Sequence, residues 1–110
     1  MTELDIVRGA IKRIEQGWCK EDYARDAWGR RVSPVAGDAC VWCLEGSIGL
    51  SFRGDYSRKR LVQRLEKSAG ILGSGKTLAD WNDEQLSRDT ILHALRLVEA
   101  ELIAEAPDAG

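Results

Sequence analysis

The spacing of hydrophobic residues along the chain predicts a mainly helical protein. Thr2 and Asp5 have the spacing of a capping box, and an apolar residue then recurs every three or four positions up to Ile14. Gly17 suits the left-handed conformation that commonly follows a last helical turn. Similar stripes, and one segment after Asp38 that is apolar nearly all the way round, predict three more helices. The four predicted helices cover residues 3–16, 38–50, 57–68 and 83–103.

Residues 23–33 show a different pattern, in which two short segments flank Trp28 and Gly29. Gly29 can adopt the positive φ angle that a three-residue hairpin loop requires. Pro34 lacks the amide hydrogen that a continuing strand would need. We therefore expect a small β-hairpin between the first two helices.

The length of 110 residues suits a single compact domain, 1–110, because either half alone would be too small to hold a core. Residues 104–110 have little to pack against and are expected to form a flexible tail. The core is expected to draw on the helical stripes and on bulky residues of the first half. Its predicted members are Trp18, Trp42, Cys43, Leu61, Leu65, Ile91, Leu95 and Val98.

Hydrophobic residues make up 44% and charged residues 31% of the chain, as in ordinary globular proteins. No stretch approaches the roughly 18 apolar residues of a membrane-spanning helix. The first fifteen residues contain no continuous apolar segment. We therefore expect no signal peptide, no membrane contact and a cytoplasmic location. The three cysteines, an odd number, are then expected to be reduced thiols.

Charge is unevenly distributed along the chain, whose net charge is −2. Residues 50–76 carry seven basic and two acidic side chains, whereas residues 77–110 carry two basic and eight acidic ones. A basic helix can lie along the phosphates of a nucleic acid, but the acidic last helix can also cover it. Nucleic-acid binding by helix 57–67 is therefore the alternative function. It would rest on Arg58, Lys59, Arg60, Arg64, Lys67 and Lys76, joined by Arg53 and the hairpin arginines.

Residues 70–77 match the letters of a phosphate-binding P-loop, with Lys76 and Thr77 in the places of the lysine and the magnesium ligand. A P-loop follows a buried strand, whereas the residues before this segment are charged and have helical periodicity. We interpret the segment as a connection between helices, which leaves open a simple phosphate contact by Lys76. No other pattern indicates catalysis, so we predict no catalytic residue and lean against an enzyme.

The spacing of Cys40 and Cys43 is compatible with a metal site or a redox-active dithiol. A structural zinc ion needs four ligands, and the soft candidates are Cys19, Cys40, Cys43 and His93. A second pair at ligand spacing is missing, and free cysteines usually behave as small buried hydrophobes. We therefore predict no metal and no cofactor, and keep a zinc- or thiol-dependent protein as a second alternative.

Trp28 has two interpretations. It can fold back over the core, or it can project from the hairpin loop beside Arg30 and Arg31. A projecting tryptophan next to arginines is typical of interaction hot spots, and would indicate a protein partner or self-association. Our leading hypothesis is a non-enzymatic protein-binding or regulatory module that uses Trp28, Arg30 and Arg31 as contact residues.

Four short motifs occur in the order Gly-Trp-Cys, Ala-Arg-Asp-x-x-Gly-Arg-x-Val, Ala-x-x-Trp-Cys-x-x-Gly and Trp-Asn-Asp. They lie at residues 17–19, 24–32, 39–46 and 81–83. In these motifs the chain resembles a family of small bacterial proteins, domain of unknown function 6197. Trp28 and Cys40 depart from the pattern expected for the family. The resemblance implies one compact domain and supplies no activity, cofactor or partner.

Overall fold

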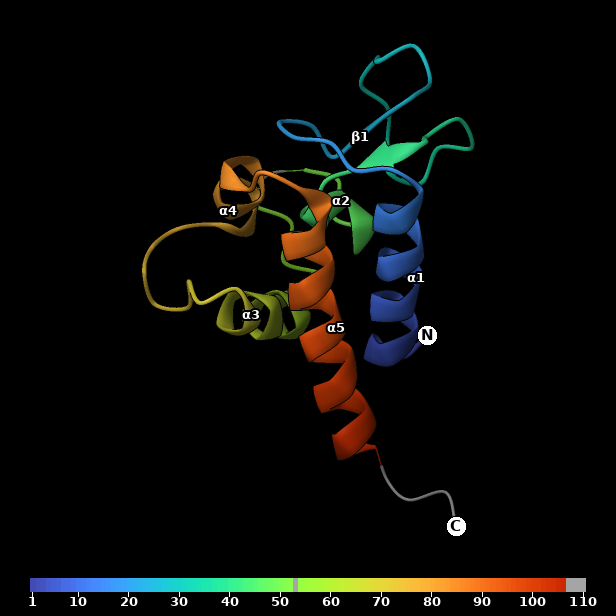
Figure 1. Cartoon of the computed structure of the whole chain (residues 1–110). Helices are drawn as coiled ribbons and strands as arrows, with labels where there is room; N and C mark the ends of the chain where they lie inside the picture. Colours follow the sequence, from blue (N-terminus) through green and yellow to red (C-terminus); the bar gives the residue numbers. More distant parts are fainter. Residues whose placement is uncertain (53, 107–110) are drawn as a thin grey trace.

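The computed structural model describes residues 1–52 and 54–106 of the chain. Within these residues the chain forms helices and one two-stranded antiparallel sheet (Figure 1). The elements are α1 (Glu3–Gln16), β1 (Ala24–Arg25), β2 (Val41–Trp42), α2 (Leu44–Ser47), α3 (Lys59–Ser68), α4 (Leu78–Glu84) and α5 (Arg88–Glu105). The prediction of a mainly helical chain with a small hairpin between its first two helices is therefore confirmed.

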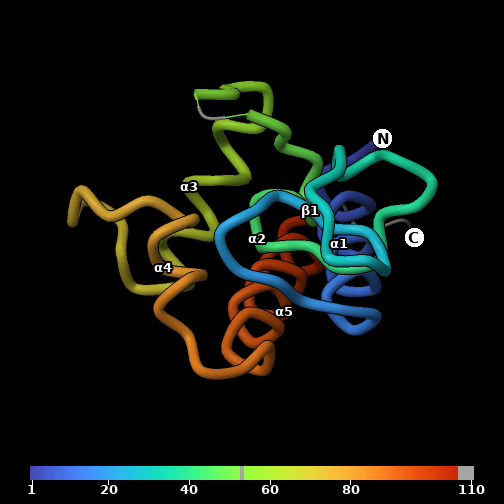
Figure 2. The backbone as a smooth tube through the Cα atoms, turned by 90° about the horizontal axis from the view of Figure 1, so that it is seen from above, coloured from blue at the N-terminus to red at the C-terminus, as the bar shows by residue number. Residues whose placement is uncertain are grey.

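Helix α5 is the centre of the packing. It lies beside α1 on one side, while α3 and α4 lie on the other side, as both views show (Figure 1 and Figure 2). All the predicted core residues are buried except Trp18, which is half-buried and packs against the core. The sheet and the loops of residues 26–40 gather at the end of the molecule where α1 ends. None of the helices described is both long and apolar enough to cross a membrane.

Helix α1 begins and ends at the predicted residues, but the conformation of the residue that follows it differs from the prediction. The Asp5 amide donates to Thr2 Oγ1 and the Thr2 amide donates to Asp5 Oδ2, each at 3.1 Å, which completes the capping box. Gly17 is extended, with a φ of −178°, so the predicted left-handed conformation is wrong. A Cβ atom at Gly17 would lie 2.6 Å from Val41 Cγ1 and 2.7 Å from the Cys40 carbonyl oxygen. Glycine is needed there because β2 passes close by.

The helix predicted over 38–50 is wrong in its first half. Val41 and Trp42 form β2, and Cys43, not Asp38, caps the short helix α2. The Trp42 amide donates to the Gly17 carbonyl oxygen at 3.1 Å, so β2 is held by the segment after α1 as well as by β1. A short apolar run is compatible with either a buried helix or a buried strand, and long-range pairing decided in favour of the strand.

The predicted hairpin over 23–33 exists with a different strand partner. Arg25 and Arg31 form an isolated antiparallel bridge, and the Val32 amide donates to the Ala24 carbonyl oxygen at 3.1 Å. The strand paired with β1 is nevertheless β2, with Ala24 opposite Trp42. Residues 26–31 therefore form a loop at the edge of the sheet.

The last predicted helix, over 83–103, is two helices. Thr77 caps α4, whose body contains the Trp-Asn-Asp motif, and Ser87 caps α5. The predicted helix over 57–68 is confirmed as α3, which Gly70 follows with a φ of 78°. Ala104 and Glu105 continue α5, so the predicted tail begins too early, and its residues 107–110 lie outside the described part of the chain.

Candidate protein-contact site

The loop that carries Trp28 is organised by one buried carboxylate. Asp26 Oδ1 accepts hydrogen bonds from the Trp28 and Arg30 amides, and Asp26 Oδ2 accepts one from Arg30 Nε, each at 2.9 Å. Gly29 has the predicted positive φ, 78°. Burial alone would raise the pKa of Asp26, but these hydrogen bonds from Arg30 and Trp28 hold it below its ordinary value. The loop is therefore fixed from within by its own carboxylate.

Trp28 projects from this fixed loop into solvent. Its side chain is 81% exposed, which settles the two interpretations in favour of projection. The side chains of Arg30 and Arg31 are 70% and 80% exposed. The structure thus places the three predicted contact residues on one exposed loop, where the described part of the chain leaves most of the indole uncovered.

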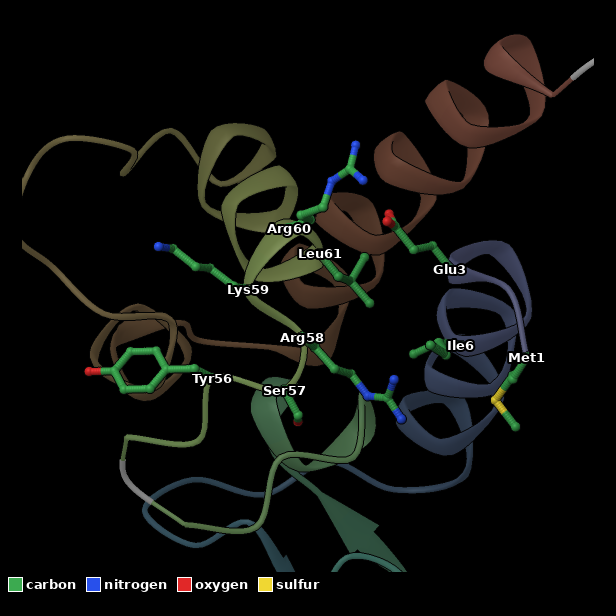
Figure 3. A pocket seen from close by; sticks show the side chains of 9 residues that line it. All are labelled: Met1, Glu3, Ile6, Tyr56, Ser57, Arg58, Lys59, Arg60 and Leu61. Carbon is green, nitrogen blue, oxygen red and sulfur yellow. The ribbon is translucent and has the colours of Figure 1, made fainter.

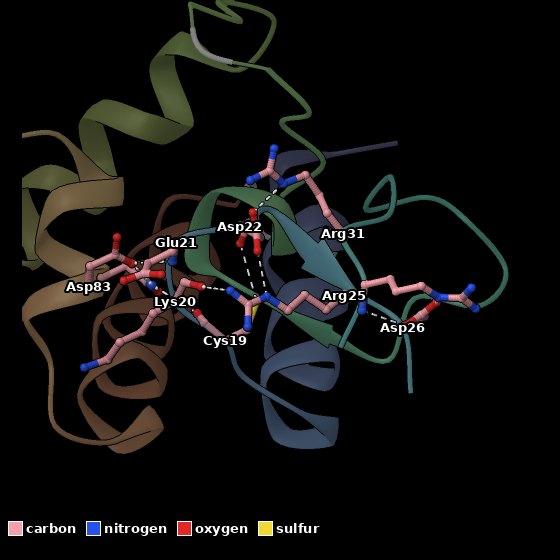
Figure 4. Close-up of polar contacts among 10 residues, drawn as sticks. Cys19, Lys20, Glu21, Asp22, Arg25, Asp26, Arg31 and Asp83 are labelled. Atoms are coloured by element: carbon pink, nitrogen blue, oxygen red, sulfur yellow. Dashed lines mark hydrogen bonds and ion pairs between the residues drawn. The ribbon is translucent and has the colours of Figure 1, made fainter. Parts of the chain in front are cut away.

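A second carboxylate, Asp22, fastens the base of the loop. Figure 4 shows it between Arg25 and Arg31, whose Nε atoms lie 2.7 and 2.6 Å from its oxygens. Burial alone would raise the pKa of Asp22, but the hydrogen bonds from these arginines hold it below its ordinary value. Arg25 and Arg31, on either side of the loop, therefore form ion pairs with the same carboxylate.

The segment after α1 is joined to α2 and α4 through Asn82, which is fully buried. Asn82 Oδ1 accepts from Trp18 Nε1 at 2.8 Å and from the Leu44 amide at 3.0 Å. Asn82 Nδ2 donates to the Cys19 carbonyl oxygen at 3.2 Å. One side chain of α4 thereby connects the segment after α1 with the start of α2.

Neither Asp26 nor Asn82 was predicted as a functional residue. An aspartate followed three residues later by glycine and then by arginine is a recognisable turn signal, so the role of Asp26 could have been read from the sequence. Apart from the neighbouring Asp83, the partners of Asn82 lie 38 to 64 residues away along the chain, and no local pattern could have identified them.

The cysteine candidates do not form a metal-binding group within the described residues. Burial raises the pKa of the Cys19 thiol to about 11 and that of Cys43 to about 12, which disfavours the thiolate that binds metals and attacks substrates. Cys43 Sγ instead accepts a hydrogen bond from the Gly46 amide at the start of α2. Cys19 and Cys40 line one open pocket, and His93 is exposed on α5, far along the chain from both. Over residues 1–52 and 54–106, no group of three or more histidine, cysteine, aspartate or glutamate residues could hold a metal ion.

The basic residues of the alternative function fall into two classes. Arg64 is paired with Glu105, Glu101 and Glu3, so the acidic last helix covers part of α3 as the charge pattern suggested. The hydrogen bonds that Arg64 donates to the Glu105 carboxylate raise the pKa of Arg64. Lys76 Nζ lies 2.6 Å from Glu84 Oε2. No side-chain hydrogen bond or ion pair within the described residues engages the other four: Arg58, Lys59, Arg60 and Lys67. Arg53 lies outside the described residues.

The glycine-rich segment over 70–77 connects α3 to α4, as interpreted from the sequence. A helix, not a strand, precedes it, and Thr77 Oγ1 accepts from the Asp80 amide as the cap of α4. Lys76 is held by Glu84. The geometry of a nucleotide-binding P-loop is therefore not present in this segment.

Comparison of the sequence with known families gives one match. The model of DUF6197, a family of unknown function, matches residues 1–101. The chain belongs to DUF6197. No curated protein and no solved structure matches the chain.

The residues through which the chain resembles DUF6197 have structural tasks. Asp26, Gly29 and Arg30 shape the loop, and Asn82 connects the segment after α1 with the start of α2. A Cβ atom on Gly46 would lie 1.9 Å from the Tyr23 carbonyl oxygen, so glycine lets α2 approach the start of β1. These motif positions hold the local structure together, and Trp28 projects from the loop that Asp26 fixes.

Proposed function

We propose that the chain is a non-enzymatic protein-binding module whose contact surface is formed by Trp28, Arg30 and Arg31. The observation that carries this proposal is an 81% exposed tryptophan on a loop whose backbone is fixed by a buried carboxylate. Exposing an indole to water is unfavourable, and tryptophan and arginine are the side chains most enriched at binding hot spots. A fixed loop also loses little conformational entropy on binding.

The partner surface that fits this loop is an apolar pocket bordered by carboxylates. The indole would fill the pocket, while the two exposed guanidinium groups would reach acceptors around its edge. The Nε atoms of Arg30 and Arg31 each form an ion pair with an aspartate of the same chain. The two guanidinium groups are therefore oriented before a partner binds. This pre-organisation supports a specific contact with one protein.

Nucleic-acid binding is the weaker alternative. Arg64 and Lys76, two of the six basic residues on which it would rest, are already paired with glutamates. The remaining basic side chains would give a smaller phosphate-contacting surface, with fewer counterions released on binding.

Capture from a lysate of the source organism distinguishes the two functions. Tagged wild-type protein, Trp28→Ala and Leu86→Ala are compared with and without nuclease, Leu86 being an equally unpartnered apolar residue at 97% exposure. We expect one protein to be retained by the wild type and Leu86→Ala despite nuclease, and to be lost with Trp28→Ala. Removing a hot-spot tryptophan costs about 2 kcal/mol or more, which is roughly a 30-fold loss of affinity. Retention of the same protein by Trp28→Ala would show that this surface is not the contact.

A further inference from the structure

A pocket of about 360 Å³ lies between the start of α1 and the start of α3, away from the Trp28 loop. Its apolar walls include Ile6 and Leu61, and its basic lining comes from Arg58, Lys59 and Arg60 (Figure 3). The volume is within the range of pockets that hold small molecules. The pocket therefore offers an apolar surface and an excess of positive charge to the same ligand.

Arg58 is the unusual group in this pocket. Its Nε atom is buried and has no hydrogen-bond partner among the described residues. The guanidinium lies against Gly49, where an added Cβ atom would be 3.4 Å from Arg58 Nε. In Figure 3 the side chain points from the start of α3 toward Ile6, whereas Tyr56 and Lys59 point away. A guanidinium is charged at every physiological pH, so a buried donor without an acceptor is costly.

The acidic group in the lining does not satisfy Arg58. Glu3 Oε2 is also buried without a hydrogen bond, but it lies 3.5 Å from Arg64 Nε and forms an ion pair there. Asp55 accepts hydrogen bonds from Ser57, which are the largest cause of its lowered pKa. The positive charge of nearby Arg58 lowers the pKa of Asp55 further, by a smaller amount. With Glu3 and Asp55 engaged elsewhere, the charge of Arg58 is left for a ligand.

We propose that this pocket binds the phosphate group of a small phosphomonoester, with Arg58 as its principal ligand. The two Nη groups of the Arg58 guanidinium can donate to two oxygens of a phosphate in a bidentate contact. Arg60 and, although its side chain points away, Lys59 add positive charge at longer range, which favours a doubly charged phosphate over a singly charged carboxylate. Ile6 and Leu61 would contact the apolar part of the molecule.

Nuclear magnetic resonance of the ¹⁵N-labelled chain tests this directly through the Arg58 Nε–H signal. Phenyl phosphate is the probe and benzoate the comparison, at constant ionic strength and up to about 10 mM, enough to saturate a site of millimolar Kd. We expect a saturable shift of the Arg58 signal with phenyl phosphate, and binding at least tenfold weaker with benzoate. Arg58→Lys keeps the charge but removes the planar guanidinium, and should weaken phenyl phosphate binding at least tenfold. Arg96→Lys, an exposed ion-paired arginine outside the pocket, should leave it unchanged.

Three results would overturn the proposal. They are the absence of a saturable Arg58 shift, equal affinity for phenyl phosphate and benzoate, and unchanged affinity in Arg58→Lys. A single-stranded oligonucleotide is titrated in parallel. If it bound through Arg58 much more tightly than phenyl phosphate, the site would belong to a nucleic acid and the small-molecule assignment would be wrong.

Discussion

Gly46 is the position where the fold leaves least room for change. A Cβ atom there would lie 1.9 Å from the carbonyl oxygen of Tyr23, 2.7 Å from its carbonyl carbon and 3.1 Å from its Cα atom. All three are backbone atoms, so no side-chain rotation can relieve the overlap. In Gly46→Ala, α2 and the start of β1 would have to move apart by about 1.5 Å to restore ordinary contact.

The cost follows from what that movement disturbs. Overpacking of this kind costs about 1–3 kcal/mol, and the hydrogen bond from the Cys43 amide to the Tyr23 carbonyl oxygen, 3.3 Å long, contributes about 1 kcal/mol. Alanine is favoured over glycine in a helix by about 0.5–1 kcal/mol, which offsets part of the loss. We expect Gly46→Ala to lower the free energy of unfolding by about 2–3 kcal/mol. That corresponds to a fall in Tm of roughly 10–15 °C for a domain of this size.

Gly37→Ala is the matched control. A Cβ atom on Gly37 meets nothing within 4 Å, and this glycine does not have a positive φ angle. We expect its unfolding free energy to stay within about 0.5 kcal/mol of the wild type. Urea unfolding followed by circular dichroism measures both variants. Equal stability of Gly46→Ala and Gly37→Ala would refute the close approach of α2 and β1.

Three further predictions concern the buried polar groups. In Asn82→Ala, the Trp18 indole N–H and the Leu44 backbone amide both lose their hydrogen-bond acceptor. The free energy of unfolding, measured with urea, should therefore fall by about 2–4 kcal/mol. Trp18→Phe removes the indole donor, so Asn82→Ala should lower the free energy of unfolding less in a Trp18→Phe background than in the wild type. The Cys43 thiol is 5% exposed and has a pKa of about 12. It should therefore react with iodoacetamide at pH 8 only after urea unfolds the chain. Half-buried Cys40 should react in the native state. Because the folded-state pKa of Asp26 lies below its ordinary value of 3.8, its contribution to stability is present above that value and lost as pH falls further. Asp26→Asn should therefore be less stable at pH 7 and show a weaker loss of stability between pH 5 and pH 2.

The sequence predicted best those elements whose signals are local. The bounds of helix α1 were predicted correctly, and the signal for its start is local because Thr2 and Asp5 form its cap within four residues. The turn at Gly29 was correct because a positive φ angle is a property of that residue and its neighbours. The sequence did not predict that Trp42 belongs to a strand, because that depends on pairing with Ala24 and on hydrogen bonds to the segment around Gly17.

The candidate site was predicted in part for the same reason. Trp28, Arg30 and Arg31 were identified as a group from the sequence, but the exposure of Trp28 depends on what the rest of the chain leaves uncovered. The basic patch looked continuous in the sequence, and only the fold shows that Arg64 faces the glutamates of α5. A list of charges gives no indication of which charges neutralise each other.

Site-specific photo-crosslinking tests most directly whether the Trp28 loop contacts a protein. The photoreactive residue p-benzoylphenylalanine is placed at position 28, and in a second sample at the exposed position of Leu86, in cells of the source organism. Our account predicts one discrete adduct, dependent on light, from position 28 and none from position 86. The absence of an adduct at position 28, or the same adducts from both positions, would contradict the proposal that this loop is a binding surface.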